Sequence, residues 1–171
     1  MTPVRHAHSL PGMPIEIRNQ FDVERAADEV WTFLTDPERF VPCMPGARLV
    51  RVIDEDSFEG EVGISAGPLV ATLRGVIRFD RVDAESFHAE LSGEASSRRP
   101  PASASMQMTS FLTPLEDGLT RVEVAQTLRL SGALALVAHL GLFQSLADLI
   151  LGRFARCVQK RLGTPAAEGT A

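Results

Sequence analysis

The sequence predicts an α+β fold in which an antiparallel sheet of about six or seven strands wraps around one long C-terminal helix. A series of segments with alternating apolar and polar residues, separated by turn signals, fills residues 49–130. Two short helical segments precede that series and follow a first strand. Between Arg129 and Asp148 the chain carries no formal charge, and its apolar residues recur at three- and four-residue steps. Helices that are segregated from a run of strands favour α+β over a doubly wound sheet.

The first elements are a strand and two short helices. Ile15–Val23 alternates apolar and polar residues, which is typical of a strand with one buried face. Ala26–Leu34 has helical spacing of its apolar residues and ends before Asp36-Pro37, because the residue before a proline is disfavoured in a helix. We expect Asp36 to cap a second helical turn over Pro37–Phe40.

The strands that follow are bounded by charged turns. Asp54-Glu55-Asp56 forms an acidic turn, and Glu116-Asp117-Gly118 predicts a tight hairpin. The predicted strands are Leu49–Ile53, Phe58–Ile64, Leu69–Phe79, Phe87–Gly93, Met106–Leu112 and Arg121–Leu130. The segments Pro42–Ala47 and Arg98–Pro101 contain prolines and lack apolar periodicity, so we expect both to be exposed loops.

A single helix is predicted from about Leu134 to Leu162. Its uncharged part is near the lower limit for a membrane span, about 18 residues, but His139, Gln144 and Ser145 favour a buried helix instead. The apolar face of this helix is predicted to contain Leu136, Leu140, Phe143, Ala147, Ile150, Phe154 and Val158.

Length and charge limit the classes of function. A chain of 171 residues is most simply one domain, which we place at residues 14–162, with disordered ends over residues 1–13 and 163–171. The net charge of −5 argues against nucleic acid as a partner, and the doublet Arg98-Arg99 is far too small a basic patch. The first thirteen residues lack the apolar segment of a signal peptide, so we expect a cytoplasmic protein.

Cys43 and Cys157 are the two cysteines of the chain. A disulfide between them is one interpretation, but a domain of this size needs no covalent staple. We therefore expect two free thiols in a reducing cytosol.

Small residues at inward positions of the strands predict a cavity. Gly60, Gly75, Ala89 and Gly93 fall where a filled core would have bulky side chains, although glycines also permit a sheet to bend. Filling the cavity by Gly75→Leu is expected to abolish binding of an apolar ligand without unfolding the domain. The predicted lining residues are Phe58, Gly60, Val62, Leu73, Gly75, Ile77, Ala89, Leu91, Met106, Met108, Val124, Gln126, Leu128, Leu136, His139, Leu140 and Phe143.

Few polar groups are available inside that cavity. Gln126 and His139 are candidates to orient a ligand carbonyl group, and Ser110 is a weaker one. No nucleophile elbow, phosphate loop, CxxC pair or acid–base dyad is present, and His6 and His8 are too few for a metal site. We therefore expect neither a catalytic residue nor a metal centre, and we favour a ligand carrier over an enzyme.

Several segments, in this order, resemble the CoxG family of carbon monoxide dehydrogenase accessory proteins. That family is part of the START-like (SRPBCC) superfamily of helix-grip domains, and the resemblance covers about residues 15–162. The segments are Phe21-Asp22-Val23, Val30-Trp31-Thr32-Phe33-Leu34-Thr35-Asp36-Pro37-Glu38, Pro45-Gly46-Ala47, Gly60 with Val62, Ala66-Gly67-Pro68, Leu73-Arg74-Gly75 and Ser131-Gly132-Ala133-Leu134-Ala135.

The resemblance implies a protein that binds a large apolar molecule, such as menaquinone or another quinone or lipid, without a covalent cofactor. It further implies service to a molybdenum hydroxylase of the carbon monoxide dehydrogenase type at the inner face of the cell membrane. Many family members continue past the helix into an extension implicated in membrane contact, whereas this sequence ends at Ala171. The alternatives are an enzyme of the polyketide cyclase or dehydratase type and an assembly factor without a ligand.

Overall fold

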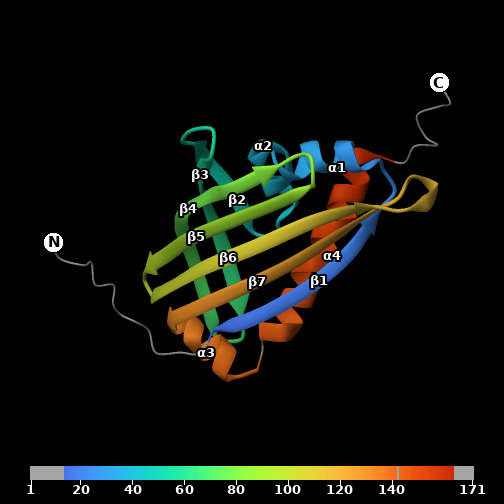
Figure 1. Ribbon diagram of the computed structural model, residues 1–171. Coiled ribbons are helices and arrows are strands. Elements are labelled where there is room, and N and C mark those ends of the chain that lie inside the picture. The colour runs from blue at the N-terminus through green and yellow to red at the C-terminus, as the bar shows by residue number, and fades with distance from the viewer. Residues whose placement is uncertain (1–13, 142, 164–171) are drawn as a thin grey trace.

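The computed structural model describes residues 14–141 and 143–163; the predicted disordered ends therefore lie outside the described residues, apart from Gly163. One strand and three short helical elements come first, six further strands follow, and two helices end the described chain (Figure 1). In order they are β1 (Ile15–Val23), α1 (Ala27–Leu34), α2 (Pro37–Phe40), η1 (Val41–Cys43), β2 (Ala47–Val52), β3 (Ser57–Ala66), β4 (Leu69–Asp83), β5 (His88–Arg98), β6 (Pro101–Pro114), η2 (Glu116–Gly118), β7 (Thr120–Gly132), α3 (Ala133–His139) and α4 (Phe143–Leu162).

The strands form one sheet in the order β1-β7-β6-β5-β4-β3-β2, and every neighbouring pair is antiparallel. The predicted α+β class and antiparallel sheet are confirmed. The strands β5 and β6 are longer than expected, because main-chain pairing continues through the predicted loop up to the pair Arg98 and Pro101. This hairpin lacks the apolar alternation that marks a strand with a buried face, so the sequence pattern gave no sign of it.

The two short helices lie where the sequence predicts them. In α1 the side chains of Val30, Trp31 and Phe33 are buried. The carboxylate of Asp36 accepts a hydrogen bond from the backbone N–H of Glu38 at 3.0 Å, which confirms Asp36 as the cap of α2. Both helices pack at the end of the sheet where α4 also ends (Figure 1).

The predicted long C-terminal helix is confirmed as α4, but its predicted start near Leu134 is wrong, because the chain bends by 98° between α3 and α4. Gly141 has a φ of +73°, a conformation that favours glycine and commonly terminates a helix. The residues before and after this break do not share one helical face. Leu134 and Val137 are the buried residues of α3, whereas Leu136 and Leu140, which were predicted to be on the buried face, are about half exposed.

The prediction of two free thiols is also wrong, because Cys43 and Cys157 form a disulfide that joins η1 to α4. The two residues are 114 positions apart, so no local pattern reveals that they meet. Both belong to one apolar cluster, in which Cys43 is buried and Cys157 is partly buried. The disulfide therefore ties the C-terminal half of α4 to the segment after α2.

Two separate apolar clusters, rather than one, cover the inner face of the sheet. The first cluster lies between the sheet, α1, η1 and α4, and its buried members include Phe33, Phe58, Phe79 and Val158. The second cluster joins α3 to strands β4 and β6; its buried residues are Leu69, Ala71, Leu73, Ala102, Leu134 and Val137. Of the strand residues predicted to line a ligand, Phe58, Ala89 and Leu91 are buried in the first cluster and Leu73 is buried in the second. The other predicted strand residues are only partly buried.

Candidate functional site

The strand residues predicted to line the ligand all occupy one face of the sheet. The register shows this, because residues directly opposite each other on paired strands share a face. Gln126 lies opposite Met108, which lies opposite Leu91, and Val124 lies opposite Ser110, which lies opposite Ala89. The thirteen residues on this inner face are Phe58, Gly60, Val62, Leu73, Gly75, Ile77, Ala89, Leu91, Met106, Met108, Val124, Gln126 and Leu128.

Two adjacent cross-strand rows of this face are only partly buried and lie where the two clusters meet. Ile77 and Met106 pack against the first cluster, and Ala95, Ala104 and Leu130 pack against the second. We call these rows the inner floor. Half of its eight residues are glycine or alanine, and the floor contains no titratable side chain. Its first row is Ile77, Gly93, Met106 and Leu128, and its second row is Gly75, Ala95, Ala104 and Leu130.

The helix α4 does not seal the inner floor. It makes its closest approaches to β1 and η1, where the rings of Phe21 and Phe154 meet edge to face at 6.0 Å. Val158, in the C-terminal half of α4, is the buried residue of this helix, whereas Ala147, Ile150 and Phe154 are only partly buried. The N-terminal half of α4 therefore leaves apolar surface accessible on the same side of the sheet as the inner floor.

The predicted residues on the C-terminal helices do not gather in one place. The break at Gly141 ends the predicted helix, so α3 buries Leu134 and Val137 instead of the predicted face. The predicted residues that are left exposed on the other side are Leu136, His139 and Leu140. Phe143, the first residue of α4, is partly buried and packs against the second cluster. Of these four residues, only Phe143 packs against a cluster that borders the inner floor.

Gln126 is the amide side chain next to the inner floor. Its neighbours across the sheet are Ile17 on β1 and Met108 on β6, both apolar. Its side chain is partly buried, and within the described part of the chain its amide makes no side-chain hydrogen bond. The amide therefore retains donors and an acceptor for a polar group of a bound molecule. Ser110 lies farther along β6, opposite Ala89 and Val124, towards the first cluster.

The glycines of the inner floor have structural reasons of their own. A Cβ atom on Gly75 would lie 1.9 Å from the carbonyl oxygen of Glu94 and 2.5 Å from Cα of Ala95, so Gly75 permits close backbone approach of β4 and β5. A Cβ atom on Gly93 would lie 2.3 Å from Cδ1 of Ile77. The proposed Gly75→Leu test is therefore unsuitable, because the added side chain would displace backbone as well as fill space.

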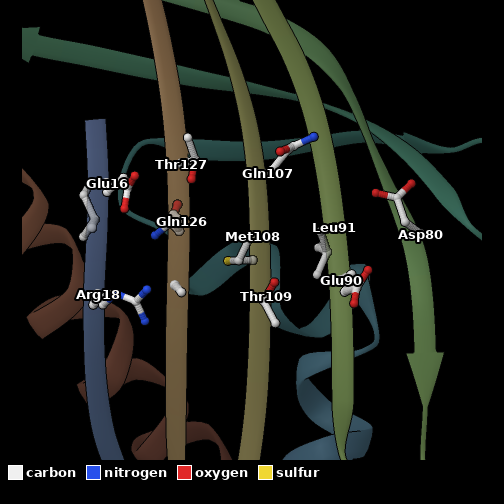
Figure 2. A pocket seen from close by; sticks show the side chains of 12 residues that line it. Glu16, Arg18, Asp80, Glu90, Leu91, Gln107, Met108, Thr109, Gln126 and Thr127 are labelled. Carbon is white, nitrogen blue, oxygen red and sulfur yellow. The ribbon is translucent and has the colours of Figure 1, made fainter. Parts of the chain in front are cut away.

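The outer face of the sheet carries two hollows that the sequence did not predict. The hollow shown in Figure 2 has a volume of about 310 Å³ and is crossed by strands β1, β7, β6, β5 and β4. Its outward side chains are polar or charged except for Ala125, and they include Glu16, Arg18, Asp80 and Glu90. The second, of about 300 Å³, contains Arg74, Glu94 and Arg129. Both differ in chemistry from the apolar inner floor.

Charged side chains of the outer face are paired with one another. Glu59 receives hydrogen bonds from Nε of Arg51 and Nε of Arg74, each at 2.9 Å. These bonds, that of Arg51 first, lower the pKa of the Glu59 carboxyl. Among the described residues, no group of three or more His, Cys, Asp or Glu side chains has a geometry that would hold a metal ion. No single helix within residues 14–141 and 143–163 is long and apolar enough to span a membrane.

The antiparallel sheet and its long C-terminal helix form a helix-grip fold, and solved structures share this fold. A conserved protein from Geobacillus kaustophilus superposes with a TM-score of 0.76 at 19% identity, covering 86% of this chain and 94% of that one. The Zhui aromatase/cyclase from Streptomyces sp. R1128 gives 0.63 at 10% identity, covering 87% and 93%. Truncated norcoclaurine synthase from Thalictrum flavum gives 0.57 at 15% identity, covering 91% and 98%.

The sequence places the chain within one family. Residues 20–163 match the family model of CoxG, which is described as a subunit of carbon monoxide dehydrogenase. The chain therefore belongs to the CoxG family, as its segments predicted. A comparison with curated protein sequences gave no match.

Proposed function

We propose that this protein is a non-enzymatic carrier that holds an extended apolar molecule against the inner floor, beneath α4. The observation that supports this most directly is the inner floor itself. Two rows of small and apolar residues stay partly exposed where the two buried clusters meet, and they include no charge. A ligand that covers such apolar surface removes it from water, and this removal favours binding.

A quinone with an isoprenoid tail, such as menaquinone, is the ligand class that fits these residues. Each methylene removed from water contributes roughly 0.8 kcal/mol, so a long tail needs no covalent attachment. Met106 and Met108 provide flexible side chains that adapt to an irregular tail. The amide of Gln126 would then donate a hydrogen bond to a quinone carbonyl oxygen.

The partner we propose is a molybdenum hydroxylase of the carbon monoxide dehydrogenase type, which the name of the CoxG family suggests. A quinone carrier would pass between that enzyme and the membrane that dissolves the quinone, so we place the protein at the cytoplasmic surface of the cell membrane. The likeness to an aromatase/cyclase extends to the fold alone. An enzyme of that type needs an acid or base within reach of substrate, and the inner floor has no titratable side chain.

Leu128→Trp tests the binding site, because Leu128 lies in the first row of the inner floor between Met106 and Ile15. The larger side chain would occupy the space of the ligand, and we expect at least tenfold weaker binding of a short-tailed menaquinone analogue, or roughly 1.4 kcal/mol. Equilibrium dialysis measures the binding, and circular dichroism checks that the variant is folded. Mass spectrometry of a lipid extract from the purified parent protein would identify a retained quinone.

The matched control is Thr127→Trp, which puts the same side chain on the outer face of the same strand. It should bind the analogue like the parent protein. Equal binding by the parent and by a folded Leu128→Trp variant would contradict a site on the inner floor.

A further inference from the structure

The two ends of the sheet differ in charge. In an antiparallel sheet, alternate turns lie at the same end, so the turns β2–β3, β4–β5 and β6–β7 share one end and β3–β4 and β5–β6 share the other (Figure 1). The first set is acidic and contains Asp54, Glu55, Asp56, Asp83, Glu85, Glu116 and Asp117. The second set contains no carboxylate and has Arg98 and Arg99, both exposed, at the β5–β6 hairpin.

The end with the arginines also exposes large apolar side chains. Val70, after the β3–β4 turn, is 71% exposed, and Leu136 of α3 and Leu140, which follows α3, are 50% and 53% exposed. They lie at the same end because α3 packs on Leu69 and Ala102, which follow the β3–β4 and β5–β6 turns. We call these three residues, together with Arg98 and Arg99, the docking end.

The helix α3 is apolar on both of its faces. Leu134 and Val137 are buried under it, whereas Leu136 and Leu140 point away from the protein. A helix with apolar side chains all round is not expected to face water. Residues 130–147 contain no charged side chain, yet the chain bends by 98° after α3, so the segment does not form one straight apolar rod. An apolar surface of this shape suits the boundary of a bilayer rather than its centre.

We propose that the docking end binds the surface of an anionic bilayer. Leu136 and Leu140 enter the headgroup region, Arg98 and Arg99 contact lipid phosphates, and the acidic turns point away from the membrane. Charge complementarity favours this orientation, because anionic lipids would repel the seven carboxylates of the turns at the opposite end. The last turn of α4, with Lys160 and Arg161, lies at that opposite end as well. The proposal rests on the proposed carrier function only to explain why the protein would bind a membrane. The docking end itself is identified by its exposed apolar residues and its charge, without reference to a ligand.

The test measures co-sedimentation of the full chain with vesicles of phosphatidylcholine, with and without phosphatidylglycerol. The parent protein should bind the anionic vesicles, and added salt should weaken the binding. Leu136→Glu/Leu140→Glu should lower the partition coefficient at least tenfold, because both side chains are exposed in the free protein and their loss leaves the fold intact. Val82→Glu is the matched control, since Val82 is 49% exposed beside the acidic β4–β5 turn, and it should bind like the parent.

The arginines have a separate test. Arg98→Ser/Arg99→Ser should weaken binding to anionic vesicles by about fivefold per charge removed. Lys160→Ser/Arg161→Ser removes two exposed charges from the last turn of α4 and should have a much smaller effect. Equal loss in both double variants would contradict the orientation, because it would mean that net charge alone governs binding.

Absence of vesicle binding by the parent protein would overturn the proposal, and so would unchanged binding by a folded Leu136→Glu/Leu140→Glu variant. A third contrary outcome is a parent protein that forms a dimer and does not bind vesicles, together with a variant that is a monomer. The last outcome would assign the docking end to a second copy of the chain. Equilibrium dialysis with the menaquinone analogue separates this proposal from the carrier function. A parent protein that binds vesicles but not the analogue would refute the carrier and leave the docking end in place.

Discussion

At the scale of single residues, the same amino acid has opposite roles at two positions of this chain. Gly75 lies where β4 and β5 approach so closely that a Cβ atom would meet the backbone of Glu94 and Ala95. Gly152 lies inside α4, where a Cβ atom would have Nη1 of Arg156 as its nearest neighbour, at 3.6 Å. Glycine is therefore needed at the first position, whereas at the second it costs helix stability.

We predict that Gly75→Ala destabilises the protein by about 1–3 kcal/mol, because the two strands must move apart to admit the methyl group. Gly152→Ala should instead stabilise it by about 0.5–1 kcal/mol, because alanine has the higher helix propensity. The free energy of unfolding from urea titration measures both effects. A stability of Gly75→Ala equal to that of the parent would mean that the backbones of β4 and β5 are not in close contact.

At the scale of elements, alternation predicted the strands and their inward residues, since a period of two leaves little choice of face. The thirteen strand residues of the candidate site share one face for this reason. The helices were harder to predict, because Gly141 lies inside a run of apolar residues that continues the helical period on both sides. An isolated glycine in such a run is compatible with a continuous helix, so the break required the three-dimensional structure.

The charged ladder on the outer face predicts a pH dependence of stability at the same scale. Arg51 and Arg74 hold the pKa of Glu59 below its ordinary value by hydrogen bonding. A pKa that is lower in the folded state stabilises the protein above the unfolded-state pKa, and this contribution disappears as the pH falls through the folded-state value. The melting temperature of the parent protein should therefore fall on acidification from neutral pH to about pH 3.5, and part of this fall is due to Glu59.

Glu59→Gln should show a smaller fall in melting temperature over that range, because its amide does not titrate. The effect will be small, since the paired arginines are exposed and solvent screens the interaction. Glu94→Gln, an exposed position on the outer face of β5, is the control and should follow the parent protein. Identical acid sensitivity of Glu59→Gln and the parent would mean that the ladder does not contribute.

At the scale of the whole molecule, two apolar clusters and one disulfide determine how α4 is held. The first cluster and the bond between Cys43 and Cys157 fix its C-terminal half, whereas Phe143 joins its first turn to the second cluster. The intervening residues of α4 are only partly buried, on the same side of the sheet as the inner floor. This division explains how α4 is firmly attached at both ends while the inner floor stays partly exposed on the same side of the sheet.

The disulfide closes a loop over a sequence separation of 114 residues, so it should contribute strongly to the stability of the whole domain. A cross-link over a long loop reduces the entropy of the unfolded chain, and Cys43→Ala/Cys157→Ala should lower the free energy of unfolding by about 2–4 kcal/mol. Dithiothreitol should destabilise the parent protein by a similar amount and leave the double variant unchanged, which separates loss of the bond from loss of packing. Two reactive thiols in the denatured, unreduced parent protein would show that the bond does not form. In that case α4 would be held by apolar contacts alone, and the accessibility of the inner floor would have to be measured without the cross-link.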